Sequence, residues 1–240
     1  MKEFNEQENE RIDFMKAIAF EVSKNEKSAI LKGGTSLLLT RGLDRFSEDM
    51  DFDLTPGTVT DFQKHILKAA ESVKLDIDCI NVKKNTETTK RYMVHYQSAF
   101  TKQPDVLKIE CSMRHEIEEK DAEIIQGLRV YSIARMAELK TAAFIGRDKA
   151  RDTYDVAFLV ANYPSEIRVE TWNSIKEHVQ NRGIDCLCDS FNKEQDELLE
   201  KFEGTEVVLR IQESLDRYAQ SIGSLEEEKS LKADWVTLDV

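Results

Sequence analysis

The stretch from Glu48 to Leu54 predicts a β-strand, because from Asp49 onward acidic and apolar residues alternate with a period of two. Successive side chains of a strand project from opposite faces of the sheet. The acidic set on one face is Asp49, Asp51 and Asp53, and the apolar set on the other is Met50, Phe52 and Leu54. We therefore expect this strand to lie with its apolar face against a core and its carboxylates side by side.

A row of aspartates is unusual on an ordinary exposed strand, because neighbouring like charges repel and raise one another's pKa. Carboxylate oxygens are the ligands that Mg²⁺ and Mn²⁺ prefer, so the row favours a divalent cation. Two such ions are a general device for phosphoryl and nucleotidyl transfer. A third carboxylate is expected from a neighbouring strand, and Glu110, which shares a face with Lys108 and Ser112 in the stretch 106–114, offers one.

The turn Gly33-Gly34-Thr35-Ser36 precedes the aspartates and leads into an apolar run. We expect a short helix to start there, with Thr35 or Ser36 as its N-cap. Glycines allow the backbone to approach an anion closely, and the N-terminus of a helix favours negative charge. The turn matches neither a P-loop nor GxGxxG, and a simple capped turn explains it equally well by itself.

The rest of the chain predicts an α+β or α/β N-terminal half and an all-helical C-terminal half. Helical patterns cover 8–25 and 58–73, strands are expected at 75–82, 91–98, 106–114 and 128–132, and the polar stretch Lys83 to Lys90 reads as a hairpin loop. Helical periodicity dominates from Ser132 to about Ile222, with a break at Pro164, and an acidic, partly loose tail follows.

Charge and composition limit the classes of function. The net charge of −12 excludes a wholly basic nucleic-acid-binding surface, although a local patch of Lys83, Lys84, Lys90 and Arg91 could contact an RNA backbone or be a solvated loop. No signal peptide and no stretch of about 18 apolar residues is seen, so no membrane association and a cytoplasmic location are expected. The four cysteines are expected to be free thiols, and the four histidines show no metal or triad spacing.

Two blocks of residues resemble a known family. Gly33 to Ser36, followed by Arg45-x-Ser47-x-Asp49-x-Asp51, is similar to the signature of DNA polymerase β-like nucleotidyltransferases, and most similar to the AbiEii/AbiGii toxin pattern KGGT(A/S)L…RxSxDxDF. A second block resembles the family's later K-x-x-A…R-D-x-x-D pattern; it comprises Glu138-Leu139-Lys140-x-x-Ala143 and Lys149-Ala150-Arg151-Asp152-x-x-Asp155.

The resemblance implies a nucleotidyltransferase fold, with a mixed twisted sheet flanked by helices. It implies a catalytic domain at 1–131, a helical domain at 132–225 that completes the active-site cleft, and a tail at 226–240. It also implies a toxin of a toxin–antitoxin or abortive-infection pair, with an NTP substrate, Mg²⁺ or Mn²⁺ and a cognate antitoxin. The acceptor that we expect first is tRNA. A catalytically silent nucleotide-binding module, or transfer to a protein or small molecule, remains the alternative.

The resemblance also assigns roles to individual residues. The metal ligands would be Asp49 and Asp51, with Glu110 assisting, and the nucleotide-binding set would be Gly33, Gly34, Thr35, Ser36, Arg45, Ser47 and Lys140. Lys140 would contact the triphosphate, whereas the residues alone allow a surface lysine. Asp152 would be a second functional carboxylate, with Asp155 as the alternative. Asp53 falls outside the essential pair, as a supporting group or a solvated strand end.

Ion pairs offer another explanation for the charged stretch after Gly146. Without the family resemblance, Arg147, Lys149 and Arg151 could pair with Asp148, Asp152 and Asp155 in an exposed network.

Overall fold

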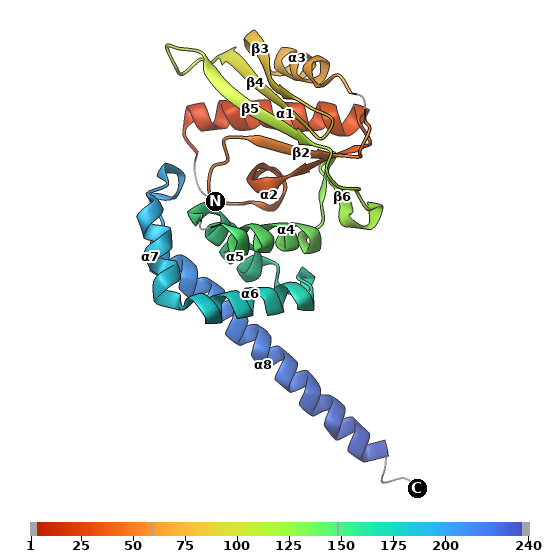
Figure 1. The fold of residues 1–240 in the computed structure, drawn as a ribbon, viewed down its shortest axis with the longest axis vertical. Coiled ribbons are helices and arrows are strands. Elements are labelled where there is room, and N and C mark those ends of the chain that lie inside the picture. The colour runs from red at the N-terminus through yellow and green to blue at the C-terminus, as the bar shows by residue number, and fades with distance from the viewer. Residues whose placement is uncertain (1–3, 59, 148, 237–240) are drawn as a thin grey trace. The chain divides into compact units, whose positions relative to one another are not determined.

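The computed structural model describes residues 4–58, 60–147 and 149–236, and for 224–236 it describes the backbone alone (Figure 1). The chain divides into two compact units, Met1–Met136 and Ala137–Val240. The first unit holds the sheet, and the second consists of helices.

In the described part of the first unit, seven strands form one mixed sheet in the order β3-β4-β5-β2-β1-β7-β6. The strands are β1 (Ala29–Lys32), β2 (Met50–Leu54), β3 (Asp76–Asn85), β4 (Thr89–Gln97), β5 (Asp105–Ser112), β6 (Ala122–Ile125) and β7 (Leu128–Tyr131). The pairs β2–β5 and β1–β7 are parallel, and the other neighbours are antiparallel. The strand that carries the aspartates therefore lies near the middle of the sheet.

Helices α1 and α3 cover one face of this sheet. The helices of the unit are α1 (Glu6–Asn25), α2 (Gly33–Arg41), α3 (Phe62–Val73) and a 3₁₀ turn, Glu119–Asp121. Phe62 of α3 packs edge-on against Phe52 of β2 with ring centroids 5.2 Å apart, and Phe14 of α1 does the same against Tyr96 of β4. Met50, Phe52 and Leu54 are at most 1% exposed, so the predicted apolar face of β2 is confirmed.

The second unit is built from helices. They are α4 (Ile133–Gly146), which starts just before the division, α5 (Ala150–Asn162), α6 (Val169–Arg182), α7 (Ile184–Glu194) and α8 (Gly204–Val236), with 3₁₀ turns at Pro164–Glu166 and Glu197–Leu199. Its core includes Tyr154, which contacts Phe202 with ring centroids 4.4 Å apart, and Trp172, which stacks on Tyr218. The predicted break at Pro164 is confirmed as the end of α5.

The predicted fold class is confirmed, and several predicted boundaries are wrong. Helix α3 starts at Phe62 rather than at residue 58, because the Asp61 side chain accepts from the Lys64 main-chain N–H and caps it. The expected loop is shorter, since Lys84 pairs with Arg91 and leaves only the turn 86–88. Strand β6 was not predicted.

The end of the chain also differs from the expectation. Helix α8 does not stop near Ile222 but continues to Val236, so the expected tail begins inside a helix. Residues 237–240 lie outside the described part. No helix among the described residues is long and apolar enough to cross a membrane.

Candidate active site

The Gly-Gly-Thr-Ser stretch is the first turn of helix α2, not a separate turn before it. The N-cap is Lys32, which makes no side-chain capping bond, so the predicted cap at Thr35 or Ser36 is wrong. The Thr35 hydroxyl instead donates to the main-chain oxygen of Asp49 and lies 2.8 Å from Ser47 Oγ. Ser36 is 1% exposed in the same turn. Thr35 thereby fastens the segment before β2 to the start of α2.

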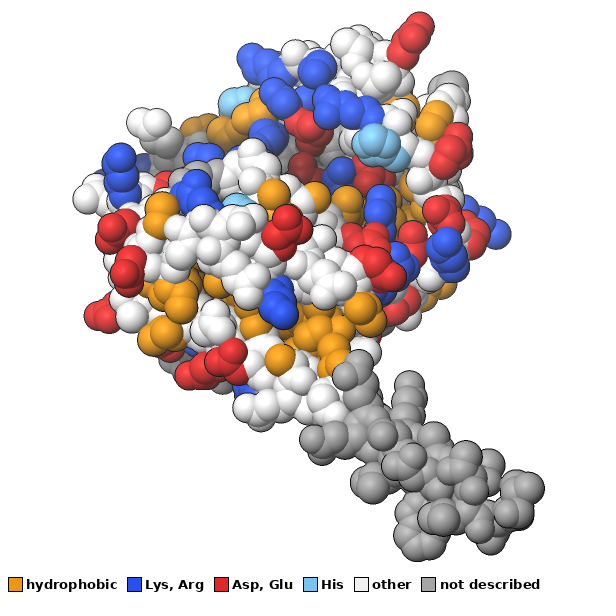
Figure 2. Space-filling model, turned by 60° about the horizontal axis from the view of Figure 1, so that its bottom comes forward, with side chains coloured by type: hydrophobic (Ala, Val, Ile, Leu, Met, Phe, Trp, Pro, Cys, Tyr) orange, Lys and Arg blue, Asp and Glu red, His pale blue; other side chains and the backbone are white. Residues whose placement is uncertain are grey.

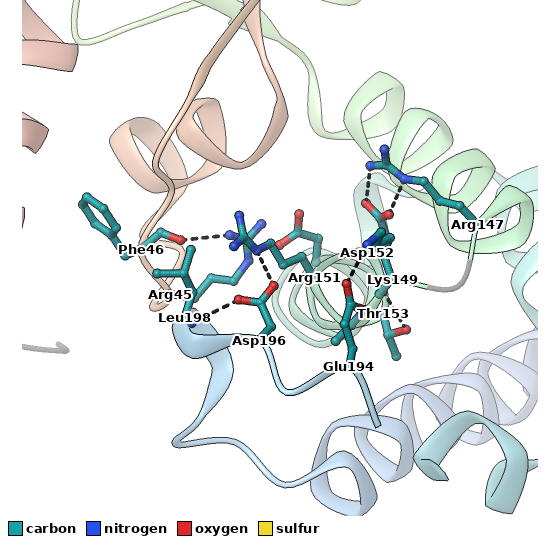
Figure 3. Close-up of polar contacts among 12 residues, drawn as sticks. Arg45, Phe46, Arg147, Lys149, Arg151, Asp152, Thr153, Glu194, Asp196 and Leu198 are labelled. Atoms are coloured by element: carbon teal, nitrogen blue, oxygen red, sulfur yellow. Dashed lines mark hydrogen bonds and ion pairs between the residues drawn. The ribbon is translucent and has the colours of Figure 1, made fainter. Parts of the chain in front are cut away.

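The two glycines are required because other side chains approach this turn closely. Gly33 has φ +76°, and a Cβ there would lie 3.2 Å from Asp51 Oδ2. A Cβ on Gly34 would lie 2.8 Å from Arg45 Nη2 and 3.0 Å from Ser47 Oγ. Arg45 is 3% exposed and donates to the Phe46 carbonyl at 2.9 Å (Figure 3). The structure therefore brings the glycines, Arg45, Ser47 and Asp51 together around the N-terminus of α2, where a helix favours an anion.

The predicted carboxylates lie on neighbouring strands. Asp51 on β2 is directly beside Glu110 on the parallel strand β5, and Asp49 comes just before β2. Lys108 forms an ion pair with Asp49, and Arg91 donates from Nη2 and Nε to Glu110 Oε2 at 2.6 and 2.8 Å. These two cations were not predicted as part of the site, although the alternation that places Lys108 on the same face as Glu110 was a signal for one of them.

Electrostatics sets Asp51 apart from an ordinary surface carboxylate. Burial raises its pKa above the ordinary value, and the neighbouring charges of Asp49 and Glu110 act in the same direction. Lys32 and Lys108 oppose this shift without cancelling it. A positive charge delivered close to Asp51 would relieve the cost of ionising it.

The donor chemistry of this set fits a hard divalent cation, because Asp49 and Asp51 supply the carboxylate oxygens that Mg²⁺ and Mn²⁺ prefer. Across residues 4–58, 60–147 and 149–236, however, no group of three or more histidine, cysteine, aspartate or glutamate side chains is arranged to hold a metal ion. Glu110, the third predicted ligand, is engaged by Arg91. The fit is therefore one of ligand type and placement on the sheet, not of a preformed three-ligand cage.

Asp53 is not a solvated strand end, and that alternative is wrong. It is 6% exposed, and its Oδ1 accepts from Lys32 Nζ at 2.6 Å. Its Oδ2 accepts from the Tyr131 hydroxyl of β7 at 2.9 Å. Lys32 lies directly opposite Asp51 in the β1–β2 pairing, so the network around Asp53 extends to the neighbour of Asp51.

The predicted residues of the helical unit are held in ion pairs. Lys140 pairs with Asp155 at 2.5 Å, and their side chains are 12% and 0% exposed, so the alternative of a surface lysine is wrong. Asp152 is 2% exposed and accepts from Arg147 at 2.6 and 3.0 Å (Figure 3).

The other cations of this stretch have partners that were not predicted. Lys149 pairs with Glu194 at 2.9 Å, and Arg151 pairs with Asp196 (Figure 3). Asp148, one of the expected partners, lies outside the described residues. Of the expected pairs, the structure has Arg147 with Asp152, but this carboxylate is buried, so the network is not an exposed one. The other two pairs join the start of α5 to the end of α7 and to the segment after it.

The basic residues of the β3–β4 hairpin remain a candidate surface for a polyanion. Lys83 is exposed, and Lys84, Lys90 and Arg91 are half-buried. Lys and Arg side chains gather on one part of the face drawn in Figure 2, with acidic side chains among them.

Cysteines and histidines form no group that could hold a metal ion within the described part of the chain. All four cysteines are free thiols, as predicted, and burial raises the pKa of the Cys111 thiol. His65 lies 3.0 Å from Glu26, and His178 packs edge-on against Phe144.

Comparisons with known proteins define the class first. The structure of JHP933 from Helicobacter pylori is 28% identical, with a TM-score of 0.84, over 96% of this chain and 99% of that one. A second H. pylori structure, provisionally described as a nucleotidyltransferase, is 28% identical with a TM-score of 0.82, over 92% and 99% of the two chains. A search of curated proteins finds no match. The fold is that of a nucleotidyltransferase.

The family follows from a model that covers almost the whole chain. Residues 13–237 match the family described as "Nucleotidyl transferase AbiEii toxin, Type IV TA system". The chain belongs to this family, which confirms the resemblance seen in its two sequence blocks.

Proposed function

We propose that this protein transfers a nucleoside monophosphate from an NTP to an acceptor hydroxyl, with release of pyrophosphate, in a reaction that needs Mg²⁺ or Mn²⁺. Membership of a nucleotidyl transferase family supports the class of reaction. The observation that carries the proposal is the approach of Gly33 to Asp51: the N-terminus of α2 and the carboxylates of β2 meet at one place. A phosphate-binding helix end beside carboxylates is what binding a metal–triphosphate complex requires.

Each residue of the sheet unit then has a role that follows from its contacts. Asp49 and Asp51 would hold the ion. Glu110 would assist as a further ligand once it gives up its contact with Arg91. When bound, a divalent cation supplies Lewis-acid chemistry that activates the attacking hydroxyl and neutralises phosphate charge. Main-chain N–H groups of Gly33, Gly34 and the following residues would donate to phosphate oxygens.

The side chains around the turn would support these contacts in different ways. Ser47 would add a hydroxyl to the phosphates, and Arg45 a guanidinium. The Thr35 hydroxyl is already bonded to the Asp49 carbonyl, so Thr35 would hold the carboxylate segment in place rather than bind phosphate through its side chain. Ser36, which is buried, would act through its main chain.

The helical block supports a second set of roles. We assign Lys140 to the triphosphate, as the family pattern implies, with Asp155 as the carboxylate that holds its ammonium in place. Asp152, which is tied to Arg147, would be the further functional carboxylate. For the acceptor we favour tRNA. The argument for it is the basic hairpin, Lys83 to Arg91, whose lysine and arginine side chains could bind a polyanion. A cognate antitoxin is implied by the type IV toxin–antitoxin family.

The test is a labelling assay. The wild-type protein is incubated with each of the four α-³²P-labelled NTPs and total RNA, with Mg²⁺ or with EDTA. We expect one or more NTPs to label RNA only when the metal is present. Asp51→Asn should reduce the labelling by at least about 10³-fold, because it removes a carboxylate that would hold the metal ion against the transferring phosphate. Asp78→Asn, which changes an exposed carboxylate on β3 of the same sheet, is the matched control and should label normally.

Each other outcome contradicts a defined part of the proposal. Full labelling by Asp51→Asn would reject the carboxylate mechanism. Metal-dependent label on protein or small molecules, but not on RNA, would reject the acceptor. No label in any fraction would favour a catalytically silent nucleotide-binding module.

A further inference from the structure

We propose that Lys32 binds the triphosphate of the NTP, and that Asp53 and Tyr131 are positioning residues that hold its ammonium at the site. This inference rests on the proposed function, because it names a phosphate contact of the same site. It gives a role to three residues that the carboxylate chemistry leaves without one.

The first argument is the position of Lys32. Lys32 is the last residue of β1, directly opposite Asp51 on β2, so the two side chains project from the same face of the sheet. It is also the N-cap of α2, the residue before the glycine that approaches Asp51. A positive charge on this residue lies beside both the carboxylates and the helix end that would bind phosphate.

The second argument is how the ammonium is held. Asp53 Oδ1 accepts from Lys32 Nζ at 2.6 Å, while Asp53 Oδ2 accepts from the Tyr131 hydroxyl at 2.9 Å. The Asp53 side chain is 8% exposed, whereas that of Lys32 is 27% exposed. The carboxylate is thus fixed inside the protein from two sides, and the cation that it fixes still reaches the surface. A lysine whose rotamers are restricted in this way loses less entropy when it binds a ligand.

The third argument is that a purely structural ion pair would not need this arrangement. The sheet unit contains a second cation–aspartate–tyrosine network, in which Asp105 accepts from Arg11 at 2.7 Å and from Tyr96 at 3.2 Å. In that network both charged side chains are nearly buried, at 12% and 16% exposed. The network at Lys32 differs because its cation is partly exposed and stands next to other charged groups. It is the one suited to a ligand, and the other serves as its control.

The experiment measures binding of inorganic tripolyphosphate by calorimetry in the presence of Mg²⁺, so it does not depend on turnover. Lys32→Met should weaken binding by about 10-fold or more, because a charge-assisted hydrogen bond is lost. Lys32→Arg should retain most of the affinity. Tyr131→Phe should weaken it by a smaller factor, since Asp53 keeps the ammonium but loses one of its own anchors.

The double variant Lys32→Met/Asp53→Asn separates binding from folding. Lys32→Met alone leaves a buried carboxylate without its cation and is expected to lower Tm, whereas the double variant removes both charges and should recover Tm in part. Its tripolyphosphate affinity should stay as weak as that of the single variant. The control pair Arg11→Met/Asp105→Asn should leave affinity unchanged.

The outcomes distinguish this inference from the proposed reaction. Wild-type affinity in the folded double variant would overturn the role of Lys32 and show that it only neutralises Asp53. Loss of affinity in the double variant, in a protein that labels no acceptor, would retain the phosphate contact and reject the transfer reaction instead.

Discussion

Asp51 of the sheet unit and Asp155 and Asp152 of the helical unit have opposite electrostatic surroundings. In the helical unit, Asp155 and Asp152 are almost completely buried, and they form close ion pairs with Lys140 and Arg147, respectively. In the sheet unit, Asp51 lies beside other carboxylates, and its pKa is raised by burial and by their charges. Paired charges hold a structure together once formed, whereas neighbouring like charges cost stability and are retained where a ligand compensates for them.

The largest effect that this comparison predicts is in the helical unit. Lys140→Met should lower the free energy of unfolding by about 3–5 kcal/mol, because it removes the ammonium from a carboxylate that is fully buried. Urea unfolding followed by circular dichroism measures the change. Lys176→Met, at an exposed lysine of α6, should change it by less than about 0.5 kcal/mol. If the two variants were equally stable, the Lys140–Asp155 ion pair would not stabilise this unit.

An intermediate effect is expected at the glycines that border α2. Gly33 and Gly42 both have a left-handed backbone, with φ +76° and +74°, but only Gly33 has another residue's side chain within 4 Å of its Cβ position. Alanine at either position should cost about 1–2 kcal/mol of stability. Only Gly33→Ala should also reduce nucleotidyl transfer, because its methyl group would press on Asp51. Equal transfer rates for the two variants would break the link between this turn and the carboxylates.

The smallest expected effect is at Asp51, where removing a charge should raise Tm rather than lower it. Because the pKa of Asp51 is higher in the folded protein than in the unfolded chain, its ionised form disfavours folding at neutral pH. Asp51→Asn should therefore raise Tm slightly at pH 7 in EDTA, although we expect the same variant to lose transfer. The difference should shrink as the pH falls through the folded pKa and vanish only below about pH 3, where the carboxyl is neutral in the folded and the unfolded states. Scanning calorimetry checks this, and a lower Tm at pH 7 would show that Asp51 stabilises the fold.

The features that sequence predicted best are those set by local periodicity. The alternation in β2 predicted the buried face of Met50 and Phe52 correctly, and the alternation in β5 placed Leu107 and Ile109 in the core. Local propensity failed where tertiary contacts decided the outcome. Two successive glycines predict a turn, yet they begin a helix here, because Thr35 binds the main chain at Asp49 and fixes the helix start against β2.

The partners of the charged groups could not be predicted, because they come from other strands. Nothing in the local sequence of β2 indicates that Tyr131 will reach Asp53 from β7, or that Arg91 will reach Glu110 from β4. These contacts depend on the order and register of strands, which periodicity does not specify. The short β6, Ala122–Ile125, was missed for a related reason, since it follows a run of charged residues and gains its identity by pairing with β7.

The parallel pairing of β2 with β5 has a consequence for a cell that synthesises this protein. Asp49 and Lys108 are 59 residues apart in the chain, and Tyr131 is 78 residues from Asp53. Translation adds about 5–20 residues per second, so the first aspartates leave the ribosome several seconds before the strand that completes their surroundings. Contacts between such distant residues also form slowly, because a long loop must close before they are made. A nascent chain that ends before β5 carries the two glycines and the aspartates but not the strand that completes their surroundings, and so the synthesis of these residues is separated in time from the assembly of the candidate active site.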